Sequence, residues 1–308
     1  MMRRPKITVI GSSNTDLVAK APKLPAPGET VLGSEFIIAP GGKGANQAVA
    51  VARLGGDVTF VAKLGMDDFG DQALENFKRD GIRTDFIFRD EEAPSGVALI
   101  FVDDGGENMI VAAQGANARL LPADIDAARD AIEGADMVVL QLETPMETVE
   151  HAVAIAADKG VPVVLDPAPG RKLDANLIRR IDYLKPNETE AEILTGTRVT
   201  DDATARKAGE KLLGFGAGNA IVTLGKRGAM LVTPDESCLI PTFDTVAIDA
   251  TAAGDAFTGG MAYALADGRE LRDAVTFANA VASLAVTKMG AQPSMPTRDE
   301  LEKFLVMN

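Results

Sequence analysis

The chain has 308 residues, with 45 acidic side chains against 31 basic ones and a formal net charge of −14. This length allows one large domain, or one domain with a smaller addition, and a composition of 46% hydrophobic and 25% charged residues excludes a disordered or fibrous protein. The acidic balance argues against binding to a nucleic-acid backbone, which needs clustered lysine and arginine, but leaves a small nucleotide open as a ligand.

Cysteine and histidine each occur once, which narrows the chemistry further. Cys238 alone excludes an intramolecular disulfide and a cysteine-based zinc site, and His151 alone excludes a site built from several histidines. No apolar run approaches the roughly 20 residues that a membrane-spanning helix needs. The N-terminus lacks the apolar region and cleavage site of a signal peptide. We therefore expect a soluble cytoplasmic protein whose partners include neither a membrane nor a nucleic acid.

Short aliphatic runs alternate with amphipathic stretches through most of the chain. The runs are rich in β-branched residues, as expected of buried strands, and span residues 7–11, 58–65, 136–143, 161–168 and 220–225. Helical spacing of apolar residues marks 44–56, 68–81, 122–134 and 144–160, and later 251–268, 270–290 and 297–308. This alternation predicts an α/β fold: a central, mostly parallel sheet with helices on both faces and right-handed crossovers.

Two stretches, 15–40 and 95–115, interrupt this alternation with strand-like runs that have turn signals and no helix between them. They predict a small, mostly antiparallel sheet that covers a site as a lid or contacts a second subunit. The alternative is that these strands extend the main sheet. The first interpretation divides the chain into an α/β domain (1–14, 41–94 and 116–308) and a β lid (15–40 and 95–115).

Polar residues follow the predicted strands, at the edge where open α/β sheets bind their ligands. Glycines that let the backbone approach closely, next to an amide and an ammonium group, suit a polyhydroxylated ligand. Taken singly, the glycine turn could serve only a positive φ, and the glutamate only the N-terminus of the following helix. The residues are Asn14 and Asp16 after the first strand, Gly42, Lys43 and Asn46 in PGGKGANQ (40–47), and Glu143 after the third strand.

The stretch VAIDATAAGDAFTGG (246–260) predicts a strand, a tight turn and a helix with Asp255 in its first turn. Backbone N–H groups at 252–255 would point out of the helix terminus and form an anion hole for a phosphoryl group. Asp255 could accept a proton from a substrate hydroxyl, and we expect the helix terminus to keep its pKa low. The competing interpretation is an ordinary helix-terminal aspartate, worth ~0.3–1 kcal/mol to stability.

Two further stretches suggest a nucleotide site, although a Walker A loop and a dinucleotide-binding G-x-G-x-x-G are both missing. In YLKPNETEAEIL (183–194), Asn187 and Glu190 could hold a hydrated Mg²⁺ through water, but their spacing also fits a capping box. The strand-turn-strand pattern VTLGKRGAML (222–231) could present backbone groups and a cation to a polyphosphate, or be an ordinary hairpin. Its candidate residues are Thr223, Gly225, Lys226 and Gly228.

In combination, these motifs resemble the ribokinase-like carbohydrate kinases along nearly the entire chain. The order and spacing are specific even where single motifs are not. GGKGANQAVA, with NTD and GAQPS, points to the ribokinase branch rather than to fructokinases or adenosine kinases. The matching stretches include GSSNTD, PAPGETV, GGKGANQAVA, GVALIFVDDGGEN, LQLETP, LDPAPGR, KPNETEAEILTG, VTLGKRG, DATAAGDAFTGG and GAQPSMP.

The resemblance implies ATP-dependent phosphorylation of D-ribose at O5, with Asp255 as the base, an anion hole at Ala252, Ala253 and Gly254, and a homodimer formed through the lid. It places Asn14, Asp16, Gly42, Lys43, Asn46 and Glu143 on the sugar. It places Asn187, Thr223, Gly225, Lys226, Gly228, Gly254 and Asn279 at ATP, and Glu190 on Mg²⁺ through water. It also implies a monovalent-cation site, usually for K⁺, at Asp249, Thr251, Ala285, Lys288, Gly290 and Ser294.

The chain departs from the family pattern at three positions. Ala252 stands where the wider family often has glycine, Thr251 where an aliphatic residue is expected, and Ala112, on the lid, where a larger aliphatic residue would touch the sugar. The small side chain of Ala112 leaves room for a substrate bigger than ribose. The alternative function is therefore a kinase of the same fold for another pentose, such as 2-deoxyribose, or for a nucleoside, which would need that room. A sugar or nucleotide sensor without activity is a further alternative, but it predicts a damaged base or anion hole.

Overall fold

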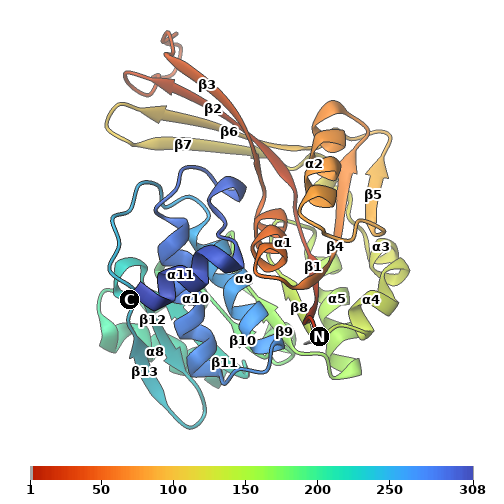
Figure 1. The fold of residues 1–308 in the computed structure, drawn as a ribbon, viewed down its shortest axis with the longest axis vertical. Helices are drawn as coiled ribbons and strands as arrows, with labels where there is room; N and C mark the ends of the chain where they lie inside the picture. Colours follow the sequence, from red (N-terminus) through yellow and green to blue (C-terminus); the bar gives the residue numbers. More distant parts are fainter. Residues whose placement is uncertain (1–2, 308) are drawn as a thin grey trace.

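The computed structural model describes residues 3–307, which form two β-sheets (Figure 1). The larger sheet has nine strands in the order β13-β12-β11-β10-β9-β8-β1-β4-β5 and is parallel from β11 to β5, with two antiparallel strands at one edge. Its strands are β1 (Lys6–Ile10), β4 (Asp57–Gly65), β5 (Ile87–Asp90), β8 (Met137–Leu140), β9 (Val163–Leu165), β10 (Tyr183–Leu184), β11 (Asn219–Thr223), β12 (Ala229–Val232) and β13 (Ser237–Ile240). The predicted, mostly parallel sheet is confirmed.

Helices cover both faces of this sheet and divide the apolar core into two parts. One face packs against α1 (Lys43–Arg53), α2 (Asp68–Arg79), α9 (Ala253–Ala266), α10 (Leu271–Ala285) and α11 (Arg298–Met307). The other packs against α3 (Pro122–Ala127), α4 (Arg129–Glu133), α5 (Met146–Lys159), α6 (Ala175–Ile178), α7 (Glu188–Thr195) and α8 (Asp202–Gly214). The described residues also form three short 3₁₀ helices: η1 (Gly115–Arg119), η2 (Gly225–Arg227) and η3 (Gln292–Ser294). Within residues 3–307, no helix is long and apolar enough to cross a membrane.

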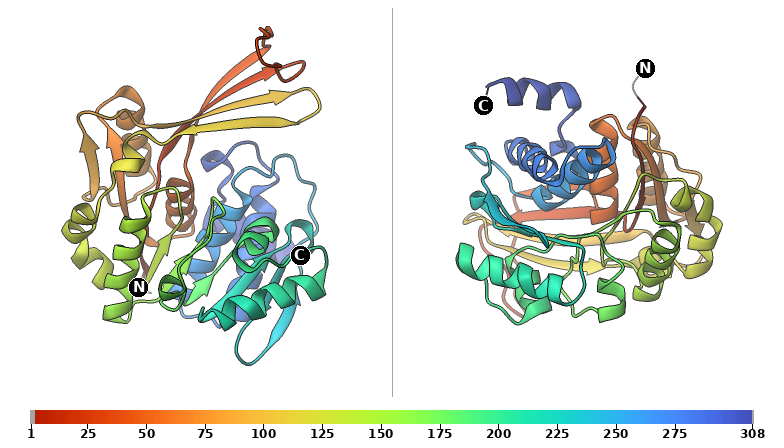
Figure 2. Two further views of the ribbon diagram at one scale, coloured as in Figure 1. Left: turned by 180° about the vertical axis from the view of Figure 1, so that it is seen from behind. Right: turned by 90° about the horizontal axis from the view of Figure 1, so that it is seen from below.

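The four-stranded sheet is separate from the main sheet, so the lid strands do not extend it. Its order is β3-β2-β6-β7, with antiparallel pairs β2–β3 and β6–β7 joined by the parallel pair β2–β6. The strands are β2 (Asn14–Ala21), β3 (Glu35–Gly41), β6 (Gly96–Asp103) and β7 (Asn108–Ala113). Figures 1 and 2 show this lid projecting from the α/β body over the side that holds α9 and α10.

Two local predictions were wrong. Residues 246–249 form no strand, because the N–H groups of Ile248 and Asp249 donate to the carbonyl of Val286 instead of to a neighbouring strand. The side chain of Val246 is 85% exposed, so the apolar run that suggested a strand is not buried. The helix expected at 122–134 is broken at Ala128 into α3 and α4.

Gly259 brings α9 against α1. A Cβ atom at this position would lie 2.7 Å from Cβ of Ala50 and 3.0 Å from the carbonyl oxygen of Gln47. Only glycine therefore allows this separation of the two helices. The contact fixes the distance between the first turn of α9, which carries Asp255, and the polar side chains of α1.

Candidate active site

The candidate residues gather at one edge of the main sheet. The parallel strands β1, β8, β9, β10 and β11 all point their carboxyl ends to this edge, where open α/β sheets bind ligands. The N-terminal ends of α1 and α9 approach the same place, and β2 leads from it into the lid.

Asp255 is buried in the first turn of α9, and both of its carboxylate oxygens accept hydrogen bonds from α1. Asn46 Nδ2 donates to Oδ2 at 2.8 Å, and Gln47 Nε2 donates to Oδ1 at 3.0 Å. Burial raises the pKa of Asp255, although the positive charge of Lys43 opposes the shift. The expectation that the helix terminus keeps this pKa low was wrong, because loss of water outweighs the helix dipole. A raised pKa makes Asp255 a stronger proton acceptor.

The turn before α9 supplies free backbone donors. Ala252 has φ = 58°, in the left-handed region, a conformation that glycine adopts more easily than alanine. The N–H group of Ala253 donates to the carbonyl of Ala250 within the turn. The N–H groups of Gly254 and Asp255 have no acceptor among residues 3–307, so both are free to donate to an anion, as the predicted anion hole requires.

Gly42 and Lys43 begin α1 beside Asp255. Gly42 has φ = 88°, and a Cβ atom there would lie 2.6 Å from the backbone nitrogen of Asn14, so glycine is required on both grounds. Lys43 is half-buried among carboxylates. Their negative charge, first that of Asp255, raises its pKa, so Lys43 is a permanent cation in the site.

Glu143 follows β8 but does not cap α5, where no side chain accepts a capping hydrogen bond. Its carboxylate instead accepts hydrogen bonds from the hydroxyl of Ser12 and, at 3.1 Å, from the N–H group of Lys43. Glu143 is therefore the acidic partner of the α1 terminus and lies in the predicted sugar site.

Asn14 and Asp16 lie on β2, so they belong to the lid strand rather than to a loop after β1. Asn14 is oriented by Asn117, whose Nδ2 donates to its Oδ1 at 2.8 Å. Burial, with the nearby charges of Glu143 and Asp255, raises the pKa of Asp16 to about 6. A carboxylate that lacks water in this way is ready to accept hydrogen bonds from sugar hydroxyls.

Asn187 and Glu190 do form a capping box at the start of α7. Each backbone N–H group donates to the other residue's side chain at 2.8 Å. This role does not exclude Mg²⁺, because Glu190 also faces Asp166, and burial together with the Asp166 charge raises the pKa of Glu190. Asp166 Oδ1 is buried without a hydrogen-bond partner in the described chain. Two carboxylates close enough for their charges to interact fit a cation held through water and phosphate oxygens.

The remaining nucleotide candidates lie along the same edge. Thr223 ends β11 and pairs with Asn187 in a parallel bridge, while Gly225 and Lys226 lie in η2 and Gly228 follows it with φ = 98°. VTLGKRGAML is also the hairpin of the alternative interpretation, since β11 and β12 pair antiparallel. Asn279 is buried on α10, and its Nδ2 donates to the carbonyls of Ile240 and Pro241.

Among the candidates for a monovalent-cation site, Thr251 and Gly290 are both in contact with Asp249. Asp249 accepts hydrogen bonds from Thr251, through both N–H and hydroxyl, and from the N–H group of Gly290. Although burial opposes it, these hydrogen bonds lower the pKa of Asp249, so it carries a negative charge beside the anion-hole turn. The ammonium group of Lys288 pairs with Glu300, which leaves only its carbonyl for a cation.

Sequence reasoning missed a buried polar cluster behind Asp255, formed by Gln47, Gln141, Asp166, Lys185 and Thr258. Asp166 Oδ2 accepts hydrogen bonds from Gln47 Nε2 (3.1 Å), Lys185 Nζ (2.9 Å) and Thr258 Oγ1 (3.0 Å). A signal existed, because charged residues at the ends of apolar strands 161–168 and 183–184 are costly to bury unless they are paired.

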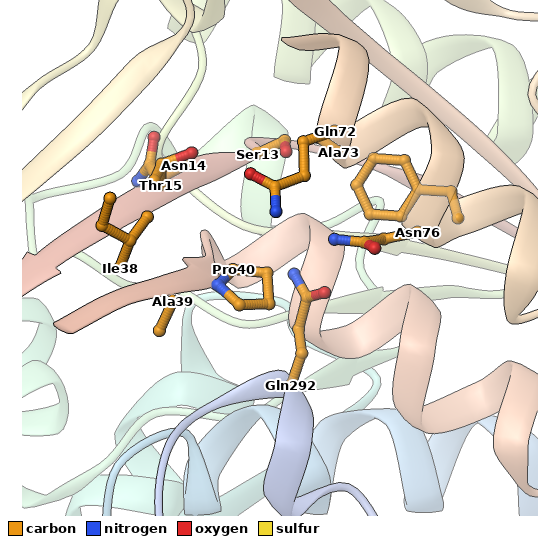
Figure 3. A pocket seen from close by; sticks show the side chains of 11 residues that line it. Ser13, Asn14, Thr15, Ile38, Ala39, Pro40, Gln72, Ala73, Asn76 and Gln292 are labelled. Atoms are coloured by element: carbon orange, nitrogen blue, oxygen red, sulfur yellow. The ribbon is translucent and has the colours of Figure 1, made fainter. Parts of the chain in front are cut away.

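A small cavity of about 30 Å³ lies where the lid joins the body, and Figure 3 shows the amide groups of Gln72, Asn76 and Gln292 turned toward it. Neither Asp16, Lys43 nor Asp255 lines it. Its volume admits about one water molecule, so it is not the substrate site.

Comparisons with known proteins agree with this arrangement. Ribokinase from Haemophilus influenzae is 43% identical over 302 residues, which cover 98% of this chain and 99% of that protein. Deoxyribokinase from Salmonella typhi is 39% identical over 303 residues, with coverage of 98% and 99%. The structure of Arabidopsis thaliana ribokinase complexed with ribose and ATP matches with a TM-score of 0.91 at 32% identity, over 98% of this chain and 99% of that one.

The family of pfkB carbohydrate kinases matches residues 4–298. This range contains the helix-terminal Asp255, the free N–H groups before it, and the polar residues that face it from α1 and the lid. The resemblance seen in the motifs is therefore confirmed, and the chain belongs to the pfkB family of carbohydrate kinases.

Proposed function

We propose that this ATP-dependent carbohydrate kinase phosphorylates D-ribose at O5. The observation that carries the proposal is Asp255, buried beside two free N–H groups and facing the cation Lys43 and the lid carboxylate Asp16. The identity to ribokinases over nearly the whole chain supports ribose as the acceptor.

In the proposed reaction, Asp255 takes the proton of the sugar 5-hydroxyl as that oxygen attacks the γ-phosphorus of ATP. The new O5–P bond forms while the bond to the β,γ-bridging oxygen breaks, and ADP leaves with that oxygen. The N–H groups of Gly254 and Asp255, and the ammonium of Lys43, stabilise the charge that develops on the transferred group. Closure of the lid would exclude water, which otherwise competes with the sugar as acceptor.

Sugar hydroxyls would bind Asn14, Asp16, Gly42, Lys43, Asn46 and Glu143, and the nucleotide would bind Asn187, Thr223, Gly225, Lys226, Gly228 and Asn279. Glu190 would hold Mg²⁺ through water, and the cation loops at 249–251 and 285–294 would hold K⁺. When bound, these ions neutralise phosphate charge and stiffen the anion-hole turn.

We also propose a homodimer through the outer face of the lid, opposite Asp16. The strand register places Phe36, Ile38, Leu99, Val111 and Met109 on this face, and their exposed fractions range from 40% to 63%. A second copy would bury this apolar patch. Sedimentation velocity would show dimers of the wild type and monomers of Phe36→Glu, whereas a monomeric wild type would refute the dimer.

A second acceptor, 2-deoxyribose, is favoured by the 39% identity to a deoxyribokinase. The lid bears on a larger acceptor instead, because Asp16 lies in one row with Ala39, Ala98 and Ala112 across the sheet. These small side chains leave space beside Asp16 for an acceptor bigger than ribose, such as a nucleoside.

The deciding experiment measures ADP release from Mg-ATP with D-ribose, 2-deoxyribose, D-fructose and a panel of nucleosides, with and without K⁺. Preference for ribose supports the proposal, and preference for 2-deoxyribose moves the specificity to the second acceptor. Asp255→Asn should lower kcat by ~10²-fold or more, with a smaller effect on sugar affinity. Near-normal turnover of that variant would exclude Asp255 as the base.

A further inference from the structure

The amide of Gln47 bridges two buried carboxylates. Its Nε2 lies 3.0 Å from Asp255 Oδ1 and 3.1 Å from Asp166 Oδ2. Gln47 is fully buried, and its neighbour Asn46 donates to the other oxygen of Asp255 at 2.8 Å. Two consecutive residues of α1 therefore hold both oxygens of the carboxylate.

The two carboxylates and Gln141 together determine which way the Gln47 amide faces. Gln141 Nε2 donates to Gln47 Oε1 at 2.6 Å, so the Gln47 oxygen points to Gln141 and its nitrogen points to the two carboxylates. The reverse orientation would place an amide oxygen against two negative oxygens and an amide nitrogen against a donor. Gln141 itself makes no hydrogen bond to Asp255 in the described structure, so it acts on Asp255 only through Gln47.

The far side of the bridge is anchored by an ion pair. Lys185 Nζ lies 2.9 Å from Asp166 Oδ2, and the two side chains are 4% and 3% exposed. Lys185 Nζ and Thr258 Oγ1 also approach the carbonyl of Gly254, at 3.4 and 2.9 Å. The same cluster that contacts Gln47 therefore fixes one peptide of the anion-hole turn.

We propose that Gln47 is a positioning residue for phosphoryl transfer: its amide, oriented by Gln141, ties the Asp255 carboxylate to the Lys185–Asp166 pair and the anion-hole turn. The inference rests on the proposed role of Asp255 as the base. A carboxylate that accepts a proton in the transition state must be aimed at the attacking oxygen, and an error of about 1 Å costs on the order of 10²-fold in rate. Asn46 alone leaves the carboxylate free to turn about its Cβ–Cγ bond.

The test uses Gln47→Met, which keeps the length of the side chain but removes the bridge. We expect kcat to fall by ~10- to 100-fold, because a hydrogen bond to a charged group is lost, while KM for the sugar stays within about twofold. Gln141→Met should lower kcat less and in the same direction. In the Gln47→Met background, Gln141→Met should have no further effect on kcat, because its only route to Asp255 has been removed.

Thr148→Val is the matched control, because it removes a buried hydrogen bond on α5, to the carbonyl of Leu120, that involves neither Asp255 nor the cluster behind it. It should lower thermal stability without changing kcat. A folded Gln47→Met with wild-type kcat, or with a raised KM and unchanged kcat, overturns the proposal. If Gln47→Met does not fold, Gln141→Met decides alone, and wild-type kcat there overturns it.

Asp255→Asn, assayed in parallel, separates this inference from the proposed function. Near-normal turnover of Asp255→Asn would refute both the role of Asp255 as the base and the positioning role of Gln47. An inactive Asp255→Asn beside a fully active Gln47→Met removes only the positioning role.

Discussion

Replacement of Asp16 by asparagine should weaken sugar binding and increase the stability of the ligand-free protein. Burial and the charges of Glu143 and Asp255 raise the pKa of Asp16 from 3.8 to about 6, which means that its ionised form is disfavoured in the folded chain. A shift of about two pKa units corresponds to roughly 3 kcal/mol. An asparagine side chain carries no charge, so the ligand-free variant Asp16→Asn should be more stable than the wild type at pH 7.5 by up to about 3 kcal/mol.

The sign follows from proton binding. Between about pH 4 and 6 the folded wild type binds a proton at Asp16 that the unfolded chain has released, so its stability falls as the pH rises through this window. Above about pH 6 the loss is complete, and below about pH 4 it is absent. The stability advantage of Asp16→Asn should therefore appear between pH 4 and 6 and then stay constant.

Urea unfolding of the ligand-free proteins at pH 4.5 and 7.5 measures the stability difference, and calorimetry with D-ribose measures affinity. We expect the variant to bind ribose ~10- to 100-fold more weakly at pH 7.5. The affinity of the wild type should itself fall about tenfold per pH unit below about 6, because Asp16 takes up a proton. This pH dependence should be missing from the variant.

Asp104→Asn, in the exposed turn between β6 and β7, is the control for loss of one lid carboxylate. It should change neither stability nor ribose affinity. If Asp16→Asn is no more stable than the wild type at pH 7.5, burial of its charge is not costly and the reasoning is refuted.

Three further substitutions test the geometry of the site. Gly259→Ala should destabilise the chain by about 1–3 kcal/mol, measured by urea unfolding, and should also lower kcat. The reason is that the added Cβ lies 2.7 Å from Cβ of Ala50 and pushes α9 away from α1. An unchanged kcat would show that the separation of the two helices does not determine the position of the Asp255 carboxylate. Ala252→Gly should stay within about 1 kcal/mol of the wild type with full kcat, because relief of the positive φ is offset by chain entropy. Ala252→Val should lose both stability and activity in the same assays, since β-branched residues avoid the left-handed region of φ and ψ. A fully active Ala252→Val would refute the idea that activity needs this conformation of the turn before α9. Lys185→Met should lower the free energy of unfolding by about 3–5 kcal/mol, because Asp166 is left buried without its counter-charge. The double variant Lys185→Met/Asp166→Asn should recover part of this loss. If it recovers nothing, the buried charge of Asp166 is not the cause.

Much of the architecture could be predicted because its signals are local. The alternation of aliphatic runs and amphipathic stretches predicted the main sheet, and the absence of helical spacing in 15–40 and 95–115 predicted a second sheet. The apolar run at 246–249 shows the limit of this reasoning. Composition favoured a strand, but a strand needs a neighbour, and the backbone bonds Val286 instead.

The site shows the same division. The residue types and spacing identified Asp255, Gly42, Lys43, Glu143 and Asp16 as candidates, because these groups suit hydroxyls and phosphates. Their ionisation could not be predicted in the same way. The helix dipole suggested a low pKa for Asp255, whereas the packing of α1 on α9 removes water and raises it.

The sequence by itself determined the family, most of the strands and helices, and the chemical groups that the site offers, since these depend on residues near one another in the chain. Only the tertiary structure decided how those groups are charged and aimed. Gln47, Gln141, Asp166 and Lys185 lie far apart in the sequence, and their hydrogen bonds exist only where the strand ends and the two helices α1 and α9 meet. The burial and orientation of these side chains depend on how the strand ends pack against α1 and α9, and no local sequence pattern encodes that packing.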